Sequence, residues 1–216
     1  MKKVLLDYDN TICDFTRMFV NKWNSLGGEF SKHKLNYDDV SEYSLLNFLM
    51  KEGYSKDKSM ELLNKFWKVN NLYQDGYVDA PHRNNVMALL KKLKKEDDVY
   101  IELNSICNSF SMSSSKLGRI KRDDELISLL NNIVIHTSTT EWKPEKPYNY
   151  DIVIEDEPTY ILKYLGKNKS GKVYMPVWSY NEHLTANKRI IPIYADTTDL
   201  PINTLKQLRD KDNREL

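Results

Sequence analysis

The chain has 216 residues, of which 40% are hydrophobic and 29% are charged, so it is long and apolar enough to form a folded core. Its formal net charge is +1, which excludes a global field that would hold the protein on nucleic acid or an acidic membrane. Its two cysteines, Cys13 and Cys107, lie far apart and make neither a disulfide framework nor a metal-binding cluster. The first apolar stretch, residues 4–6, is too short for a signal peptide or a membrane span, so we expect a soluble cytoplasmic protein.

The first predicted strand, residues 4–6, runs directly into Asp7-Tyr8-Asp9-Asn10-Thr11. Because side chains alternate along a strand, Asp7 and Asp9 should project to the same side where the strand ends. Two carboxylates in one small space repel each other unless a cation or a shared proton lies between them. This cost suggests catalysis, with one acid as nucleophile and metal ligand and the other as proton donor and acceptor. The alternative is an acidic turn after a strand.

Residues 13–78 contain no convincing strand pattern. Apolar side chains recur at helical intervals in three parts of this segment, within residues 15–23, 45–50 and 60–67. We therefore predict a small helical cap over residues 13–78, inserted after the first strand into a core made of residues 1–12 and 79–216. Such an insertion would lie beside the carboxyl ends of the strands, where sheets of this kind bind ligands. The alternative is a helical subdomain that packs only for stability.

In the rest of the chain, short apolar runs alternate with amphipathic stretches. Helices are predicted at residues 84–93, 123–130 and 159–165, and the serine-rich residues 108–115 are predicted to form a flexible loop. Further strands are predicted at residues 99–103, 133–135, 152–154, 173–177 and 189–194. This alternation predicts an α/β fold with a doubly wound, mainly parallel, Rossmann-like sheet.

A second acidic strand end follows residues 152–154, in Glu155-Asp156-Glu157-Pro158. Glu155 and Asp156 are adjacent, so in an extended chain one can face a metal while the other supports it or reaches it through water. Oxygen ligands from two strand ends, completed by water, suit Mg²⁺. Two acid-tipped strands in one chain are much harder to explain as turns than one.

Polar residues that could hold a phosphate lie between these two acidic ends. Asn104 and Ser105 follow the predicted strand at residues 99–103, and their amide and hydroxyl could hydrogen-bond a phosphoryl oxygen. Lys143 and Lys146 precede the second acidic strand, where a lysine could neutralise both a phosphate and crowded carboxylates. The alternatives are ordinary strand-end residues and exposed loop lysines.

These four pieces, in this order, resemble the motifs of the haloacid dehalogenase (HAD) superfamily of phosphotransferases. Within it, the chain is most similar to the 5'(3')-deoxyribonucleotidase family, and the similarity covers nearly the whole chain although the cap is diverged. The segments that carry it are Asp7 to Phe15, Phe66-Trp67, Val78-Asp79-Ala80-Pro81, the strand entering Asn104-Ser105, Glu155-Asp156-Glu157-Pro158, Tyr180-Asn181-Glu182-His183-Leu184 and Tyr194-Ala195-Asp196.

The resemblance implies a HAD-like fold and a Mg²⁺-dependent phosphatase acting on (deoxy)ribonucleoside monophosphates. Asp7 would attack phosphorus and become an aspartyl phosphate. Asp9 would protonate the departing nucleoside oxygen and then take a proton from water. Mg²⁺ would be held by Asp7, the main-chain carbonyl of Asp9 and Asp156, with Glu155 beside them.

The same resemblance assigns the substrate contacts. Asn104, Ser105 and a lysine would hold the phosphoryl oxygens, with Lys146 favoured by its distance from the second acidic strand and Lys143 as the alternative. Phe15 would stack on the nucleobase. Two residues depart from the family pattern: Asn104 stands where threonine or serine is usual, and Glu155 where aspartate is usual.

Two other functions remain open at this stage. One is the same chemistry on another small phosphomonoester, and the other is a catalytically silent protein that binds nucleotide or Mg²⁺ and regulates a partner. For the leading function we expect a small-molecule nucleotide as the partner, with no membrane association and no stable nucleic-acid complex. Family members often pair, so a homodimer is the one protein assembly that the resemblance suggests.

Overall fold

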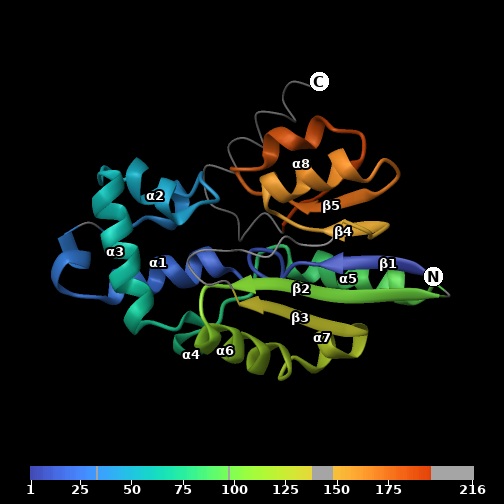
Figure 1. Cartoon of the computed structure of the whole chain (residues 1–216), viewed down its shortest axis with the longest axis horizontal. Coiled ribbons are helices and arrows are strands. Elements are labelled where there is room, and N and C mark those ends of the chain that lie inside the picture. Colours follow the sequence, from blue (N-terminus) through green and yellow to red (C-terminus); the bar gives the residue numbers. More distant parts are fainter. Residues whose placement is uncertain (33, 97, 138–147, 196–216) are drawn as a thin grey trace.

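The computed structural model describes residues 1–32, 34–96, 98–137 and 148–195 of the chain. Within this part, six parallel strands form one sheet in the order β3-β2-β1-β4-β5-β6 (Figure 1). The predicted α/β fold with a doubly wound, parallel sheet is confirmed. The strands are β1 (Lys2–Leu6), β2 (Val99–Cys107), β3 (Asn132–Thr137), β4 (Ile152–Ile154), β5 (Lys172–Pro176) and β6 (Ile190–Ile193).

The central strands are largely buried on both faces, as the apolar runs of β1 and β4 predict. Val4 and Leu6 of β1 belong to one hydrophobic cluster, while Leu5 between them belongs to the other. The first cluster includes buried side chains of α5 (Arg83–Lys94), α6 (Phe110–Ile120) and α7 (Asp124–Leu129). The second includes those of α8 (Pro158–Lys167). The helices therefore cover both faces of the sheet.

Helix α6 corrects a prediction, because it occupies most of the serine-rich segment that we expected to be a loop. The Ser109 side chain accepts a hydrogen bond from the Met112 N–H and so caps the start of the helix. Met112, Lys116 and Ile120, spaced four residues apart, are all buried. The sequence does not show the helical periodicity of α6, because a lysine occupies one of its core positions and serines fill much of the rest of the helix.

The segment between β1 and α5 forms a helical insertion, which lies beyond the carboxyl ends of β1 and β2 in Figure 1. Its own core is aromatic: the rings of Phe19 and Phe66 lie 4.9 Å apart edge to face, and Trp23 and Phe66 are 6.0 Å apart. Its elements are α1 (Phe15–Ser25), η1 (Gly28–Lys32), η2 (Tyr37–Asp39), α2 (Leu45–Lys51), α3 (Lys56–Val69) and α4 (Leu72–Asp75).

The two backbone segments through which the chain enters and leaves this insertion lie side by side. Cys13 and Asp79 form an antiparallel bridge, and the Asp14 N–H donates to the Val78 carbonyl oxygen at 2.8 Å. The division into a core and a cap with boundaries near residues 13 and 78 stays a prediction. In the described residues, no helix has the length and apolar character needed to cross a bilayer.

Candidate active site

The strand order brings the two acidic strand ends side by side. β1 pairs with β4 with Leu6 opposite Ile154, and the Asp7 N–H donates to the Ile154 carbonyl oxygen at 2.9 Å. Between these two strands the strand order changes direction, and ligands bind at such points in open α/β sheets. Residues almost 150 positions apart in the sequence therefore meet at one edge of the sheet.

Three carboxylates form a cluster at this edge. Asp7, Glu155 and Asp156 are 5%, 1% and 1% exposed, and each offers one oxygen within 4.8 Å of the others. Both members of the Glu155-Asp156 pair contribute because β4 ends at Ile154, so the strict alternation of an extended strand no longer applies. Like charges this close need a cation, and an all-oxygen donor set is the kind that Mg²⁺ prefers.

Hydrogen bonds fix the second acidic loop. Glu155 Oε1 accepts from the backbone N–H groups of Asp156 and Glu157, each at 3.1 Å. Asp156 Oδ2 accepts from the Tyr180 hydroxyl at 2.5 Å. Burial, and next the charge of Asp156, raise the pKa of Tyr180 well above its ordinary value, so this hydroxyl keeps its proton and acts as the donor.

Asp9 points to different partners, although it lines the same pocket as Asp7. Its Oδ1 accepts from the Tyr73 hydroxyl of α4 at 2.5 Å, and its Oδ2 accepts from Lys116 Nζ of α6 at 2.7 Å. The helical insertion and the core thus each supply one donor to this carboxylate. The turn that carries Asp9 is held by Asn10, which adopts a left-handed conformation with φ of 54° and accepts hydrogen bonds from Thr16.

Lys116 is a site residue that sequence analysis missed, because the serine-rich residues 108–115 before it were predicted to form a loop and no helix was predicted to continue into residue 116. Its side chain is completely buried, and Nζ also donates to Ser105 Oγ at 2.9 Å and to the Ile106 carbonyl oxygen at 3.3 Å. Burial is the largest single influence on Lys116 and lowers its pKa, but the charge of Asp9, its hydrogen bond with Lys116 and the nearby Cys107 and Asp7 together outweigh burial, so the pKa is raised. Lys116 is therefore a cation within the site.

The structure separates the two residues that we expected to bind phosphate together. β2 continues to Cys107, so Asn104 and Ser105 lie inside a strand and face opposite sides of the sheet. Ser105 lines the pocket, whereas the Asn104 amide donates to Glu102 at 3.4 Å and Asn104 is not among the lining residues. Lys143 and Lys146 lie outside the described residues.

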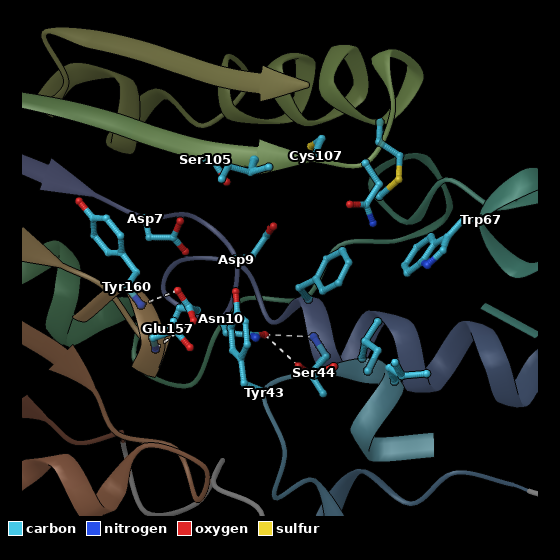
Figure 2. Close-up of a pocket in the computed structure, with 18 of the residues that line it drawn as sticks. Asp7, Asp9, Asn10, Tyr43, Ser44, Trp67, Ser105, Cys107, Glu157 and Tyr160 are labelled. Carbon is cyan, nitrogen blue, oxygen red and sulfur yellow. Dashed lines mark hydrogen bonds between the residues drawn. The ribbon is translucent and has the colours of Figure 1, made fainter. Parts of the chain in front are cut away.

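A pocket of about 710 Å³ connects the acids to an aromatic wall. Figure 2 shows Asp7, Asp9 and Ser105 between Tyr160 on one side of this pocket and Trp67 on the other. Phe15 of α1 and Trp67 of α3 both line it, and their rings are nearly parallel, 6.1 Å apart with an interplanar angle of 16°. Phe15 is predicted to stack on the nucleobase, whereas Trp67 is not assigned a role, because a tryptophan at an apolar position of a helix is more often part of the core than a ligand contact.

No protein-family model and no curated protein matches this chain. A HAD hydrolase of family IA, variant 3, from Entamoeba histolytica has a TM-score of 0.54 at 12% identity, covering 96% of this chain and 99% of that one. A Lactobacillus plantarum protein whose proposed activity is that of a phosphoglycolate phosphatase has a TM-score of 0.55 at 10% identity, covering 95% and 99%. The chain has the fold of the HAD hydrolases. The narrower resemblance to deoxyribonucleotidases stays a prediction.

Proposed function

We propose that this protein is a Mg²⁺-dependent phosphatase that hydrolyses (deoxy)ribonucleoside monophosphates through a phosphorylated Asp7. One observation carries the proposal. Asp7 belongs both to the buried acid cluster with Glu155 and Asp156 and to the pocket that Phe15 and Trp67 also line. A phosphate at the acid cluster would therefore leave the rest of its molecule in a pocket that carries aromatic rings. The HAD fold is compatible with this chemistry.

Two acids divide the reaction into two steps. An Asp7 oxygen attacks phosphorus, the ester P–O bond breaks, and the Asp9 carboxyl gives its proton to the departing nucleoside oxygen. Water then attacks the phosphorus, Asp9 takes the proton from that water, and the bond to Asp7 breaks to release inorganic phosphate. Asp7 ends as a carboxylate and Asp9 as a protonated carboxyl, as each began. Tyr73 and Lys116 hold Asp9 in place for these transfers.

The remaining polar groups serve the phosphate. The Ser105 hydroxyl, positioned by Lys116, would hydrogen-bond a phosphoryl oxygen, and Lys146 or Lys143 would add a cation. A magnesium ion held by Asp7, the Asp9 main-chain carbonyl and Asp156, with Glu155 beside them, would neutralise charge so that a carboxylate can approach an anionic phosphate.

The aromatic wall supports a nucleotide as the substrate. Phe15 and Trp67 present ring faces, and Leu63 and Met112 add apolar surface to the same pocket. Aromatic faces stack well on nucleobases, and the same pocket is lined by polar side chains such as Ser44, Asn108 and Thr159, which could hydrogen-bond the sugar of a nucleotide. A pocket of this volume is also of the size that holds a small ligand.

The test is phosphate release from deoxyribonucleoside and ribonucleoside monophosphates, sugar phosphates and para-nitrophenyl phosphate, with and without Mg²⁺. We expect the highest kcat/KM with nucleoside monophosphates, and no turnover by a folded Asp7→Asn variant. Persistent turnover in that variant would reject Asp7 as the nucleophile. Equal hydrolysis of sugar phosphates would reject the nucleotide assignment, and nucleotide binding without turnover would instead support a regulatory binding protein.

The base-binding role has its own control within the insertion. Phe15→Leu keeps the apolar volume but loses the ring face, so kcat/KM should fall about fivefold for nucleotides and stay unchanged for para-nitrophenyl phosphate. Phe30→Leu is the matched variant, because Phe30 packs against Trp23 and Phe66 and is not among the residues that line the pocket. It should leave both substrates unaffected.

A further inference from the structure

We infer that Tyr180 sets the metal preference of the acid cluster, favouring Mg²⁺ over Ca²⁺ by occupying one of the two carboxylate oxygens of Asp156. The inference rests on the proposed function, since it assumes that Asp7, Glu155 and Asp156 bind a divalent cation. It adds a residue outside the predicted ligand set. Tyr180 precedes η3 (Glu182–Ala186) and lies far from either acidic strand end in the sequence.

The bond between Tyr180 and Asp156 is short and protected. The hydroxyl lies 2.5 Å from Asp156 Oδ2, and the two residues are 8% and 1% exposed. Aromatic neighbours fix the Tyr180 ring: Trp178 stacks on it at 6.1 Å with an interplanar angle of 7°, and Tyr43 meets it edge to face at 5.7 Å. The hydroxyl is therefore held against this oxygen by packing as well as by the hydrogen bond.

The backbone around Tyr180 is tied to both acidic loops. Asn181 Nδ2 donates to the Asp156 carbonyl oxygen at 2.9 Å, and Asn181 Oδ1 accepts from the Trp178 N–H at 2.9 Å. Trp178 Nε1 donates to the Asn10 carbonyl oxygen at 2.8 Å. Residues 178–181 thus form a brace that joins the loop after β1 to the loop after β4. Tyr180 cannot withdraw from Asp156 without breaking buried hydrogen bonds.

This arrangement limits how many oxygens the cluster presents. Asp156 Oδ2 accepts a short hydrogen bond from Tyr180 at 2.5 Å, whereas Oδ1 accepts a longer one from the Thr11 hydroxyl at 3.4 Å, so Oδ1 is the oxygen better placed to bind a cation. Glu155 Oε1 already accepts from two backbone N–H groups, which disfavours two-oxygen binding by that side chain as well. Mg²⁺ binds few carboxylate oxygens, keeps several waters and demands octahedral geometry. Ca²⁺ binds six to eight oxygens and is favoured by carboxylates that bind it through both of their oxygens.

The variant Tyr180→Phe removes the hydroxyl and frees Asp156 Oδ2. Dissociation constants for Mg²⁺ and for Ca²⁺ are measured by calorimetry on the full chain after removal of metal with a chelator. We expect Mg²⁺ affinity to fall about tenfold, as for other residues that orient a metal ligand, while Ca²⁺ affinity is kept or rises. The preference for Mg²⁺ over Ca²⁺ should therefore fall by at least about tenfold.

Tyr164→Phe is the matched control, because this substitution also removes a buried hydroxyl. The Tyr164 hydroxyl donates to the Tyr150 carbonyl oxygen at 2.6 Å. It should leave both dissociation constants unchanged, and cooperative thermal unfolding of both variants shows that they fold. If Tyr180→Phe weakens the affinities for Mg²⁺ and Ca²⁺ equally, or changes neither, the inference is overturned and the proposed function still stands. Absence of Mg²⁺ binding by the unmodified protein overturns both.

Discussion

Lys116 Nζ lies 2.7 Å from Asp9 Oδ2, so a completely buried cation is in contact with one of the two acids of the first loop. The close pair of carboxylates in the sequence predicts a cation or a shared proton nearby, and Lys116 of α6 supplies a cation to Asp9. The same Nζ donates to Ser105 Oγ at 2.9 Å, so one side chain connects the proton-transfer residue to the hydroxyl proposed to bind phosphate.

Lys116→Met should therefore reduce turnover more than substrate binding. The apolar side chain fills a similar volume but leaves Asp9 and Ser105 without a shared donor, so we expect kcat to fall about 100-fold with a smaller change in KM. Loss of one partner of a buried ion pair should also lower the free energy of unfolding by about 3 kcal/mol, towards the low end because Asp9 is partly exposed. Steady-state kinetics and urea unfolding measure the two effects.

Lys91→Met provides the control, since Lys91 also pairs with a carboxylate, that of Glu125 at 2.6 Å, with both side chains about half exposed. A surface pair of this kind contributes little, so stability should change by less than about 1 kcal/mol and kcat should not change. If Lys116→Met kept full kcat, Lys116 would have only a structural role.

Removal of divalent metal should destabilise the protein through the three-carboxylate cluster. The oxygens of Asp7, Glu155 and Asp156 lie within 4.8 Å of one another, so without a cation their charges repel. We expect millimolar Mg²⁺ to raise Tm above its value in chelator, by an amount that grows with the logarithm of its concentration. Differential scanning calorimetry at several Mg²⁺ concentrations tests this.

Asp7→Asn should remove both the destabilisation in chelator and the rise of Tm with Mg²⁺. One charge fewer relieves repulsion, so Tm in chelator should rise by a few degrees, corresponding to about 1 kcal/mol, and the response to Mg²⁺ should disappear. Asp124→Asn, which changes an exposed acid at the start of α7, should retain the full Mg²⁺ response. A Mg²⁺ response that survives in Asp7→Asn would exclude Asp7 from the metal site.

The acidic loops could be predicted from sequence because two independent features agree. Each follows an unbroken apolar strand, and strand order then forces the two ends together: Asp7 and Glu155 directly follow the paired residues Leu6 and Ile154. Strands β1 and β4 were identifiable for the same reason, since burial on both faces demands continuous apolar runs.

The rest of the site depends on tertiary contacts that leave no local pattern. Lys116 can occupy a buried position of α6 because its ammonium group pairs there with the Asp9 carboxylate. The periodicity of the serine-rich segment does not reveal this contact. From the sequence, Asn104 and Ser105 had equal claims to bind phosphate, because both were expected to follow the strand. In the structure β2 continues past both, so the alternation of side chains along the strand places them on opposite faces of the sheet. Tyr180 reaches Asp156 only because the segment after β5 folds back over the acidic loops.

His82 should make the protein less stable in acid. It is fully buried, its Nε2 lies 2.8 Å from the Val177 carbonyl oxygen, and burial lowers its pKa from 6.5 to about 4. Between pH 6.5 and 4 the unfolded state therefore binds more protons than the folded state, so stability is lost as pH falls through this range. The shift corresponds to about 3 kcal/mol at pH 4.

His82→Gln keeps a side-chain N–H donor and removes the titration, so its loss of stability between pH 7 and pH 4 should be smaller than that of the unmodified protein by about 3 kcal/mol. Asp14→Asn should show the opposite change. Burial raises the pKa of Asp14 from 3.8 to about 6, so this carboxyl adds stability as pH falls through that range, and the variant loses that gain. Urea unfolding at several pH values separates the two groups, and identical pH profiles would contradict both assignments.

Two glycines on either side of the turn between α8 and β5 should respond oppositely to alanine. A Cβ on Gly171 would overlap the Tyr164 hydroxyl, which is fixed by its bond to the Tyr150 carbonyl oxygen, so Gly171→Ala should cost about 2 kcal/mol of unfolding free energy. A Cβ on Gly166 in α8 meets nothing within 4 Å, so Gly166→Ala should stabilise the helix by about 0.5–1 kcal/mol. Chemical denaturation of both variants measures these changes. Equal stability would mean that the Tyr164 hydroxyl can move aside, and with it the contact that joins α8 to the residues leading into β4.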